Sequence, residues 1–276
     1  MRVVVLAFVL AGCAVDRPLP GVGTGVVVQA GDLATAPFDL ATAPFDLSLP
    51  PGAAPDLTTP PSACGQLAAD AHTLALYHFD EAAGQTLADS SGNGRDATLG
   101  QTSAVEPEDP THAPGRLGGG LHFDGNQVAH ASASIAWPSG QFTAEAWVRY
   151  LGSDEGPFGT AMIFDADDGE LAAQGTCILW TLGAQGRMGG PPAFSDGQWH
   201  SIALTSDGAQ VLVYSDGVQV DATQVATTIG PSAGYLFGGQ LSLAHLIGDL
   251  DEIRLSDVAR TPSEIAAAYA AALACP

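Results

Sequence analysis

Residues 89–94 read "DSSGNG", a run of small residues that carry side-chain oxygens or permit sharp backbone turns. Asp89 and Asn93 offer side-chain oxygens, Asp80 offers more shortly before them, and the glycines let backbone carbonyls turn inward. Calcium takes about six to eight oxygen ligands of these kinds. One hypothesis is therefore a calcium site that uses Asp80, Asp89 and Asn93. The alternative is that Asp89 and Asn93 hydrogen-bond to their own backbone as Asx turns, which need no metal.

Carboxylates that could perform acid–base chemistry are concentrated in "GDLDEIRL", residues 248–255. Retaining hydrolysis of a glycosidic bond needs two carboxyl groups about 5 Å apart. Strand alternation places Asp249 and Asp251 on one face and turns Glu252 to the other. The acidic segment "FDADDGEL", residues 164–171, is typical of a turn. We therefore expect no catalytic pair of carboxylates.

The sequence gives little support for a catalytic nucleophile or for a catalytic metal. "GPSAG" at 230–234 has the Gly-x-Ser-x-Gly form of a nucleophile elbow, but that elbow must lead into a helix, and "YLFGGQLSLA" follows it. Ser232 is therefore interpreted as a loop residue. The seven histidines show no spacing such as His-Glu-x-x-His. We expect this chain not to be an enzyme.

Sugar binding would use exposed aromatic rings that stack on pyranose faces. The chain has four tryptophans, and aromatic residues make up 7% of it, which is low for a dedicated sugar-binding module. Trp147 and Trp199 lie within predicted strands and are interpreted as core residues. Trp137 precedes a proline and is predicted to lie in a loop, so it is the candidate platform for a sugar ring.

The elements that position these residues are short strands. "FTAEAWVRYL" (142–151) alternates between two faces, and "QVLVYSDGVQV" (210–220) contains Asp216-Gly217, a strong hairpin signal. "TPSEIAAAYAAAL" (261–273) instead predicts one helix, with Thr261 as N-cap and Glu264 completing a capping box. Many short strands at such spacing predict an all-β fold, a two-sheet antiparallel jelly-roll sandwich with a short C-terminal helix.

The first 63 residues are predicted to carry no domain. Residues 1–12 form a signal peptide with a short apolar run, and the Leu-Ala-Gly-Cys ending resembles the lipobox of bacterial lipoproteins. That resemblance implies cleavage before Cys13, lipidation of its sulfur and a membrane anchor in the cell envelope, favouring the outer membrane. Residues 13–63 are rich in proline and contain "DLATAPF" twice in tandem, which predicts an extended tether without secondary structure.

The charge balance limits the classes of partner. The chain has 30 acidic and 8 basic residues and a net charge of −22. A chain this acidic has no basic surface for nucleic acid or anionic headgroups. Calcium, polysaccharide or simple solubility are compatible with it.

Five blocks of the segment 70–270 occur in an order that indicates a known family. They are "LALYHFDEAAGQTLADSSGNGRDATL", "GRLGGGLHFDG", "FTAEAWVRY", "DGQWHSIALTSDGAQVLVYSDGVQV" and "GDLDEIRLSDVARTPSEIAAAY". Residues 64–276 resemble the laminin-G-like jelly roll of the concanavalin A-like lectin and glucanase superfamily. The resemblance implies two antiparallel sheets with neighbouring termini. It also implies that the "DLDE" strand lies beside the first strand, where Asp251 could join Asp89 or Asn93 around calcium.

The same resemblance bears on catalysis and on disulfides. Laminarinase-type members of the superfamily carry Glu-x-Asp-x-(x)-Glu on one strand, and this chain lacks that motif. Neighbouring termini suit a disulfide between Cys64 and Cys275, which export permits. Cys177, within "TCILWTL", is interpreted as a small buried hydrophobe.

The sequence therefore predicts a lipid-anchored envelope protein whose domain binds a glycan or protein ligand without catalysis. The first alternative is a structural protein that uses the jelly roll as a spacer or assembly unit. A polysaccharide hydrolase is a further alternative.

Overall fold

The computed structural model describes the folded part of the chain with a few internal gaps. The described residues are 64–137, 140–155, 159–167, 169–174, 177–183, 185–189, 195–226, 229–241 and 244–275. The predicted signal peptide, the tether over 13–63 and the lipidation site Cys13 lie outside them. No helix among the described residues is both long and apolar enough to cross a membrane.

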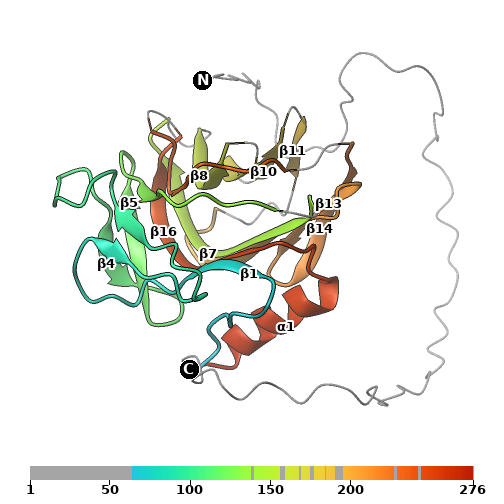
Figure 1. Cartoon of the computed structure of the whole chain (residues 1–276), viewed down its shortest axis with the longest axis horizontal. Coiled ribbons are helices and arrows are strands. Elements are labelled where there is room, and N and C mark those ends of the chain that lie inside the picture. Colours follow the sequence, from blue (N-terminus) through green and yellow to red (C-terminus); the bar gives the residue numbers. More distant parts are fainter. Residues whose placement is uncertain are drawn as a thin grey trace, which may run out of the picture. The chain divides into compact units, whose positions relative to one another are not determined.

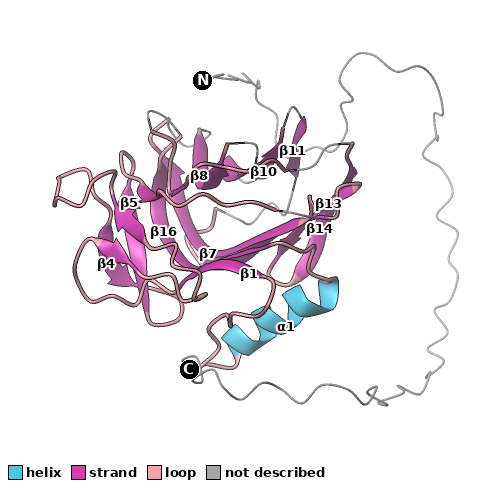
Figure 2. Cartoon of the chain, viewed as in Figure 1, coloured by secondary structure: helices cyan, strands magenta, loops and turns pink. Residues whose placement is uncertain are grey.

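Two antiparallel sheets of eight strands each form a sandwich (Figure 2). Sheet A has the order β14 (Val218–Gln224), β13 (Gln210–Ser215), β12 (Trp199–Ser206), β7 (Phe142–Ser153), β16 (Leu246–Ser256), β5 (Gly119–Asp124) and β4 (Thr111–Pro114), and β1 (Thr73–Tyr77) also pairs with β16. Sheet B has the order β11 (Gln185–Gly189), β10 (Cys177–Leu182), β9 (Gly169–Gln174), β8 (Thr160–Ala166), β15 (Tyr235–Phe237), β6 (Ala129–Ala131), β3 (Ala97–Leu99) and β2 (Thr86–Leu87). The predicted fold class is confirmed.

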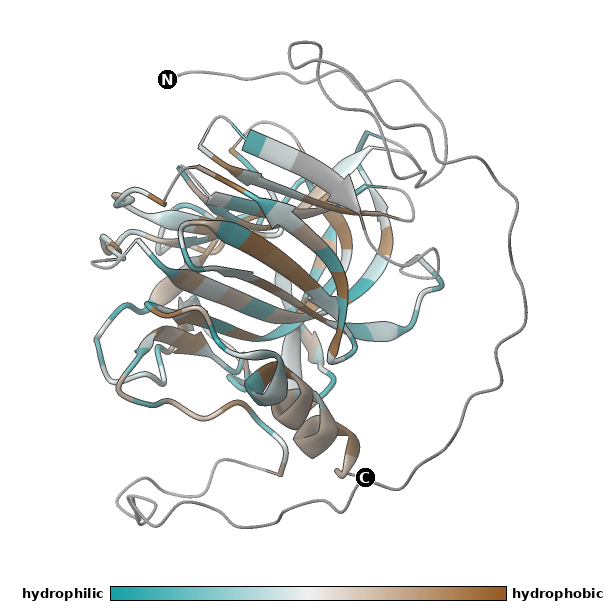
Figure 3. Cartoon of the chain, turned by 90° about the vertical axis from the view of Figure 1, so that its right-hand side faces the viewer, coloured by the Kyte–Doolittle hydropathy of each residue, from teal (hydrophilic) through white to brown (hydrophobic). Residues whose placement is uncertain are grey.

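The core lies between the two sheets because each strand turns alternate side chains inward. On β7 the inward residues Phe142, Ala144, Ala146 and Val148 are all buried in one large apolar cluster, as the alternation in the sequence predicts. Hydrophobic and hydrophilic residues alternate along several strands in Figure 3. The outward residues of these strands are therefore the ones available for a functional site.

The predicted hairpin joins β13 to β14. Asp216 and Gly217 both have positive φ angles, 53° and 74°, which is the backbone that a tight type I′ turn requires. A glycine tolerates this conformation without strain. The Asp216-Gly217 turn leads the chain into β14, the strand at one edge of sheet A.

The one helix among the described residues, α1 (Pro262–Leu273), packs against the outer face of sheet A beside β1 (Figure 1). Thr261 and Glu264 form the predicted capping box at its start. Ile265 packs on Ala203 of β12, and Ala272 packs on Trp147 of β7. The helix therefore covers part of sheet A and leaves the rest of that face open.

The predicted disulfide between Cys64 and Cys275 is present in the structure. It joins the first described residue to the end of α1, so the two ends of the folded domain lie together. Cys177 is buried, as predicted, but it takes part in a disulfide and is not simply a small hydrophobe.

Candidate functional site

Strand β16 carries three carboxylates that all face away from the core: Asp249 and Asp251 by strand alternation, and Glu252 because of a β-bulge. Leu250 and Ile253 both point into the core, so the two residues between them share the outer side. The register against β7 shifts between Asp251 and Arg254, and Glu252 has a φ of 51°. The prediction that Glu252 faces opposite to Asp249 and Asp251 is therefore wrong, because a bulge inserts one extra residue into the alternation.

These three carboxylates are buried and engaged by other residues. Asp251 Oδ2 accepts from the backbone N–H of Leu117 at 2.8 Å, and Glu252 binds His78 Nδ1 at 2.7 Å. Burial raises the pKa of Asp251 to about 8, against the opposing effect of the Leu117 hydrogen bond. A substrate cannot reach carboxyl groups covered in this way, so the acidic strand holds the outer layer together.

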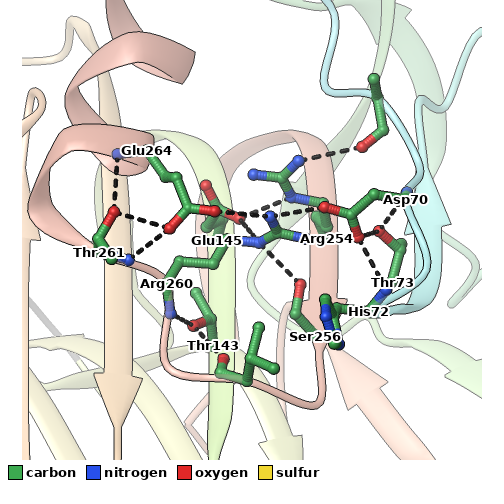
Figure 4. Close-up of polar contacts among 12 residues, drawn as sticks. Asp70, His72, Thr73, Thr143, Glu145, Arg254, Ser256, Arg260, Thr261 and Glu264 are labelled. Carbon is green, nitrogen blue, oxygen red and sulfur yellow. Dashed lines mark hydrogen bonds and ion pairs between the residues drawn. The ribbon is translucent and has the colours of Figure 1, made fainter. Parts of the chain in front are cut away.

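A network of charged side chains fills the space between sheet A and the start of α1 (Figure 4). Arg254 Nε donates to Glu145 Oε2 at 2.7 Å, and Arg260 makes two hydrogen bonds to Asp70 at 2.9 and 3.0 Å. Burial alone would raise the pKa of Asp70, but the hydrogen bonds and charge of Arg260 hold it well below its usual range. Both arginines are buried, so their charges are balanced inside the protein rather than by solvent.

A cavity of about 250 Å³ adjoins this network, between residues 65–68 and α1. Arg254 and Arg260 line it together with small residues of the helix. Because both guanidinium groups already bind carboxylates, they offer no uncompensated charge to a ligand. The cavity is therefore interpreted as part of the packing between residues 65–68 and α1, and not as a ligand site.

Asp89 and Asn93, two of the proposed calcium ligands, make hydrogen bonds within the protein. Asp89 Oδ1 accepts from the backbone N–H groups of Leu76 and Ser91, and its Oδ2 accepts from that of Arg95. Asn93 donates its amide to the backbone carbonyl of Thr73 at 2.9 Å. The Asp89–Ser91 contact is that of an Asx turn, whereas Asn93 joins the loop to β1 through its amide nitrogen.

The other two proposed calcium ligands lie around a different loop. Asp80 Oδ1 accepts from the N–H of Gly119, and Asp251 Oδ2 accepts from that of Leu117. Within the described residues no three His, Cys, Asp or Glu side chains are arranged to hold a metal ion. Asp80, Asp89 and Asp251 are therefore not gathered as one set of metal ligands, and a bound calcium stays a prediction.

Replacing Asp89 with alanine tests this interpretation. We expect a loss of about 2–3 kcal/mol in the free energy of unfolding, because three backbone N–H groups lose a charged acceptor. Urea denaturation with calcium and with a chelator measures it. The loss should be equal in both; a loss seen only with calcium would instead identify Asp89 as a metal ligand.

Trp137 is not an exposed platform. Its side chain lies in the core cluster with only 5% of the residue exposed, and its ring meets Phe142 edge-on at 6.2 Å between centroids. A loop residue before proline is buried here because the indole supplies a large apolar area to the sandwich. The prediction that Trp137 binds a sugar ring is wrong.

The open part of sheet A carries a different set of groups. Hydrogen-bonded register aligns one residue from each of five neighbouring strands: Trp199 (β12), Arg149 (β7), Asp249 (β16), His122 (β5) and Thr111 (β4). We call this set the Arg149 row. Directly paired residues of antiparallel strands project from the same face, so these five side chains lie side by side outside the sandwich.

Asp249 is the centre of the Arg149 row. It is 1% exposed, and its two oxygens bind His122 Nδ1 at 2.8 Å and Arg149 Nε at 2.5 Å. The Arg149 guanidinium also lies over the Trp199 ring, 5.7 Å from its centroid. The side chains of Arg149 and His122 remain 39% and 40% exposed. Asp249 therefore fixes both side chains, while parts of each remain in contact with solvent.

Leu151 adds an apolar surface beside the Arg149 row. It lies near Arg149 on β7, at a register shift against β16, and its side chain is exposed. The ring of Trp199 is partly exposed as well. Aligned donors next to apolar surface are the composition that carbohydrate recognition uses.

Sequence reasoning missed this site because it interpreted Trp199 as a core residue.

The sequence analysis also interpreted 164–171 as only a turn, although Asp165 belongs to β8 and Glu170 is its direct partner on β9. Burial and the charge of Glu170 raise the pKa of Asp165 to about 7. Both carboxyl groups lie on the outer face of sheet B, where Thr181 and Gln240 donate to Glu170.

Comparison with known families and structures agrees with this architecture. Residues 123–266 match the family model described as the concanavalin A-like lectin/glucanases superfamily. No curated protein matches the chain.

Several solved structures share the fold at low sequence identity. The botulinum neurotoxin type G receptor binding domain has a TM-score of 0.56 and 17% identity over 72% of this chain and 51% of that chain. The binding domain of Paraclostridial Mosquitocidal Protein 1 has a TM-score of 0.56 and 14% identity over 72% of this chain and 52% of that chain. This chain thus spans about half the length of either domain.

A smaller domain matches over nearly its whole length. Domain 4 of AbnA, a GH43 extracellular arabinanase from Geobacillus stearothermophilus, was solved in complex with arabinotriose. It has a TM-score of 0.54 and 22% identity over 72% of this chain and 98% of that chain. At these identities the likeness concerns the fold alone.

Proposed function

The chain belongs to the concanavalin A-like lectin/glucanases superfamily, and we propose that its domain binds carbohydrate at the cell envelope without cleaving it. The arabinanase domain of the same fold carries arabinotriose, and a botulinum neurotoxin of similar fold is described as depending on gangliosides for cell entry. These relatives motivate a glycan ligand for this chain, while the site has to be argued from its own residues.

The Arg149 row is the observation that carries the proposal. Arg149 is fixed by Asp249 on one side and by the ring of Trp199 on another, so little conformational entropy is lost when a ligand binds it. Its guanidinium and the ring of His122 supply polar contacts, and Leu151 and Trp199 supply apolar contacts. Sugars present hydroxyl groups and C–H faces, which fit such a surface.

A glycan array followed by calorimetric titration tests the proposal on the full chain. We expect saccharide binding that weakens at least tenfold in Arg149→Ala, because the variant loses charge-assisted hydrogen bonds. The control is Asp165→Asn, on the outer face of sheet B, which should bind as the wild type does. Binding that responds to Asp165 and not to Arg149 would move the site to sheet B. No binding on the array would favour the structural alternative, in which the jelly roll is a spacer.

The absence of catalysis is part of the proposal. The carboxylates of β16 are buried and engaged, which supports a binding role for that face. A polysaccharide hydrolase is the second candidate, favoured by the Asp165–Glu170 pair. Direct cross-strand partners have Cβ atoms about 5 Å apart, so the two side chains lie as a pair on one face, and retaining hydrolysis uses such a pair of carboxyl groups. Saccharide turnover that disappears in Asp165→Asn would establish this second function.

We also propose that the domain is held to the membrane by lipid on Cys13, through a proline-rich tether over 13–63. The support is the sequence alone: an apolar leader that ends in Leu-Ala-Gly-Cys. Cys13→Ala should move the protein from the membrane fraction to the soluble fraction, because acyl chains on Cys13 would provide the stable anchor. Membrane retention of this variant would contradict the lipid anchor.

A further inference from the structure

The hydrogen bonds within the Arg149 row determine which atoms remain for a ligand. Asp249 binds the guanidinium of Arg149, and an ionised carboxylate can only accept hydrogen bonds. The Nδ1 atom of His122 lies 2.8 Å from Asp249 Oδ1, so Nδ1 carries the proton that is donated. In a neutral imidazole the other nitrogen is then an acceptor. In its neutral form, His122 therefore presents a lone pair on Nε2, the ring nitrogen that does not bind Asp249.

Arg149 presents the opposite polarity next to it. Its Nε is used by Asp249, and its terminal nitrogens, which carry four N–H groups, can only donate. The exposed side of the row thus combines donors on Arg149 with an acceptor on His122. Both side chains bind one carboxylate, so these two polarities lie close together.

We propose that the Arg149 row recognises a neutral sugar through two adjacent hydroxyl groups; this inference rests on the carbohydrate-binding function proposed above. One hydroxyl accepts from Arg149, and its neighbour donates to His122 Nε2. A hydroxyl can do both, whereas a carboxylate or sulfate has no proton to give and would face the lone pair of His122. Arg149 and Asp249 also balance each other, and the net charge of −22 repels anionic glycans.

The length of the row indicates that the ligand is longer than one ring. From Trp199 on β12 to His122 on β5 there are three inter-strand intervals, or about 14 Å. His122 lies at one end of this distance and Trp199 at the other, and the guanidinium of Arg149 lies over the Trp199 ring. A neutral oligosaccharide lying across the strands would contact both ends.

The matched variant is His122→Asn. The Asn amide can donate to Asp249 in place of Nδ1–H, which keeps the buried carboxylate satisfied, but its shorter side chain lacks the outward acceptor. Calorimetric titration of the full chain would compare neutral trisaccharides of arabinose, xylose and glucose with their O-methylated forms and with a trisaccharide of glucuronic acid. Far-UV circular dichroism and melting confirm that the variant is folded.

We expect wild-type binding to at least one neutral trisaccharide, with roughly tenfold weaker binding to its O-methylated form. His122→Asn should weaken binding of the neutral ligand by roughly tenfold and remove the discrimination against O-methylation, because one hydrogen bond is lost. Tighter binding of the glucuronic acid trisaccharide, or unchanged binding in His122→Asn, would overturn this inference while leaving carbohydrate binding intact. If no saccharide binds the wild type, both proposals fail.

Discussion

Replacing Cys64 and Cys275 together with alanine should lower the free energy of unfolding by about 2–5 kcal/mol. The disulfide closes a loop across a sequence separation of 211 residues, and the chain-entropy model assigns such a loop about 5 kcal/mol. Urea denaturation of the oxidised wild type and of the double variant would measure the difference.

The disulfide also retains the segment that covers the acidic strand. In residues 64–70, the N–H of Leu67 donates to Glu252 Oε2 at 2.6 Å, and the carbonyl of Ala68 accepts from Arg254 at 3.0 Å. If this segment detaches, water reaches carboxylates that are otherwise buried. The variant should therefore lose protection of the Leu67 amide in hydrogen exchange before the protein unfolds globally.

Thr261→Ala provides the control for the disulfide variant. It removes the N-cap of α1 and should cost only about 1 kcal/mol, because the helix remains attached through Cys275. If the disulfide variant loses no more than this control, the two ends are held by packing and polar contacts instead.

The fold could be predicted because the strand pattern and the helix cap are local properties of the sequence. Alternation along 142–151 indicates which side chains of β7 face the core, and the Thr261–Glu264 spacing identifies the start of α1. The Cys64–Cys275 pairing followed from the resemblance, which places the termini together. None of these inferences depends on how a residue in one strand is aligned with a residue in a distant strand.

The candidate site could not be predicted because it depends on register. Trp199, Arg149, Asp249 and His122 are far apart in the sequence and meet only through the pairing of four strands. The bulge at Glu252 likewise has no local signature, since any simple alternation assigns that residue to the core face. The burial of two tryptophans also differs from the expectation: Trp137 is buried, and Trp199 is partly exposed. Whether such a ring is covered depends on which distant residues pack against it.

The buried charge network explains how so acidic a chain keeps a tightly packed outer layer. Arg254 and Arg260 each bind a carboxylate from a different part of the sequence, Glu145 on β7 and Asp70 before β1. They thereby join sheet A, the first segment and α1. Asp249 and Glu252 on β16 are buried as well and bind His122 and Arg149, and His78, respectively, while exposed carboxylates are screened by solvent.

Glu145→Ala should lower the free energy of unfolding by about 3–5 kcal/mol, the range typical when one partner of a buried ion pair is removed. Glu145 is buried, binds Arg254 at 2.7 Å and lies 3.6 Å from Arg260. Without it, Arg254 keeps only the carbonyl of Ala68 as a partner among the described residues. Urea denaturation of the wild type and the variant would measure the loss.

A second variant distinguishes the ion pair from simple loss of packing. Glu145→Leu combined with Arg254→Met removes both charges and keeps most of the volume, so it should recover much of the stability lost in Glu145→Ala. Glu106→Ala, at an exposed loop position, is the surface control and should change stability by less than about 0.5 kcal/mol. If Glu145→Ala costs as little as this control, water must hydrate Arg254 in the variant. The Glu145–Arg254 ion pair would then contribute little to the free energy of unfolding.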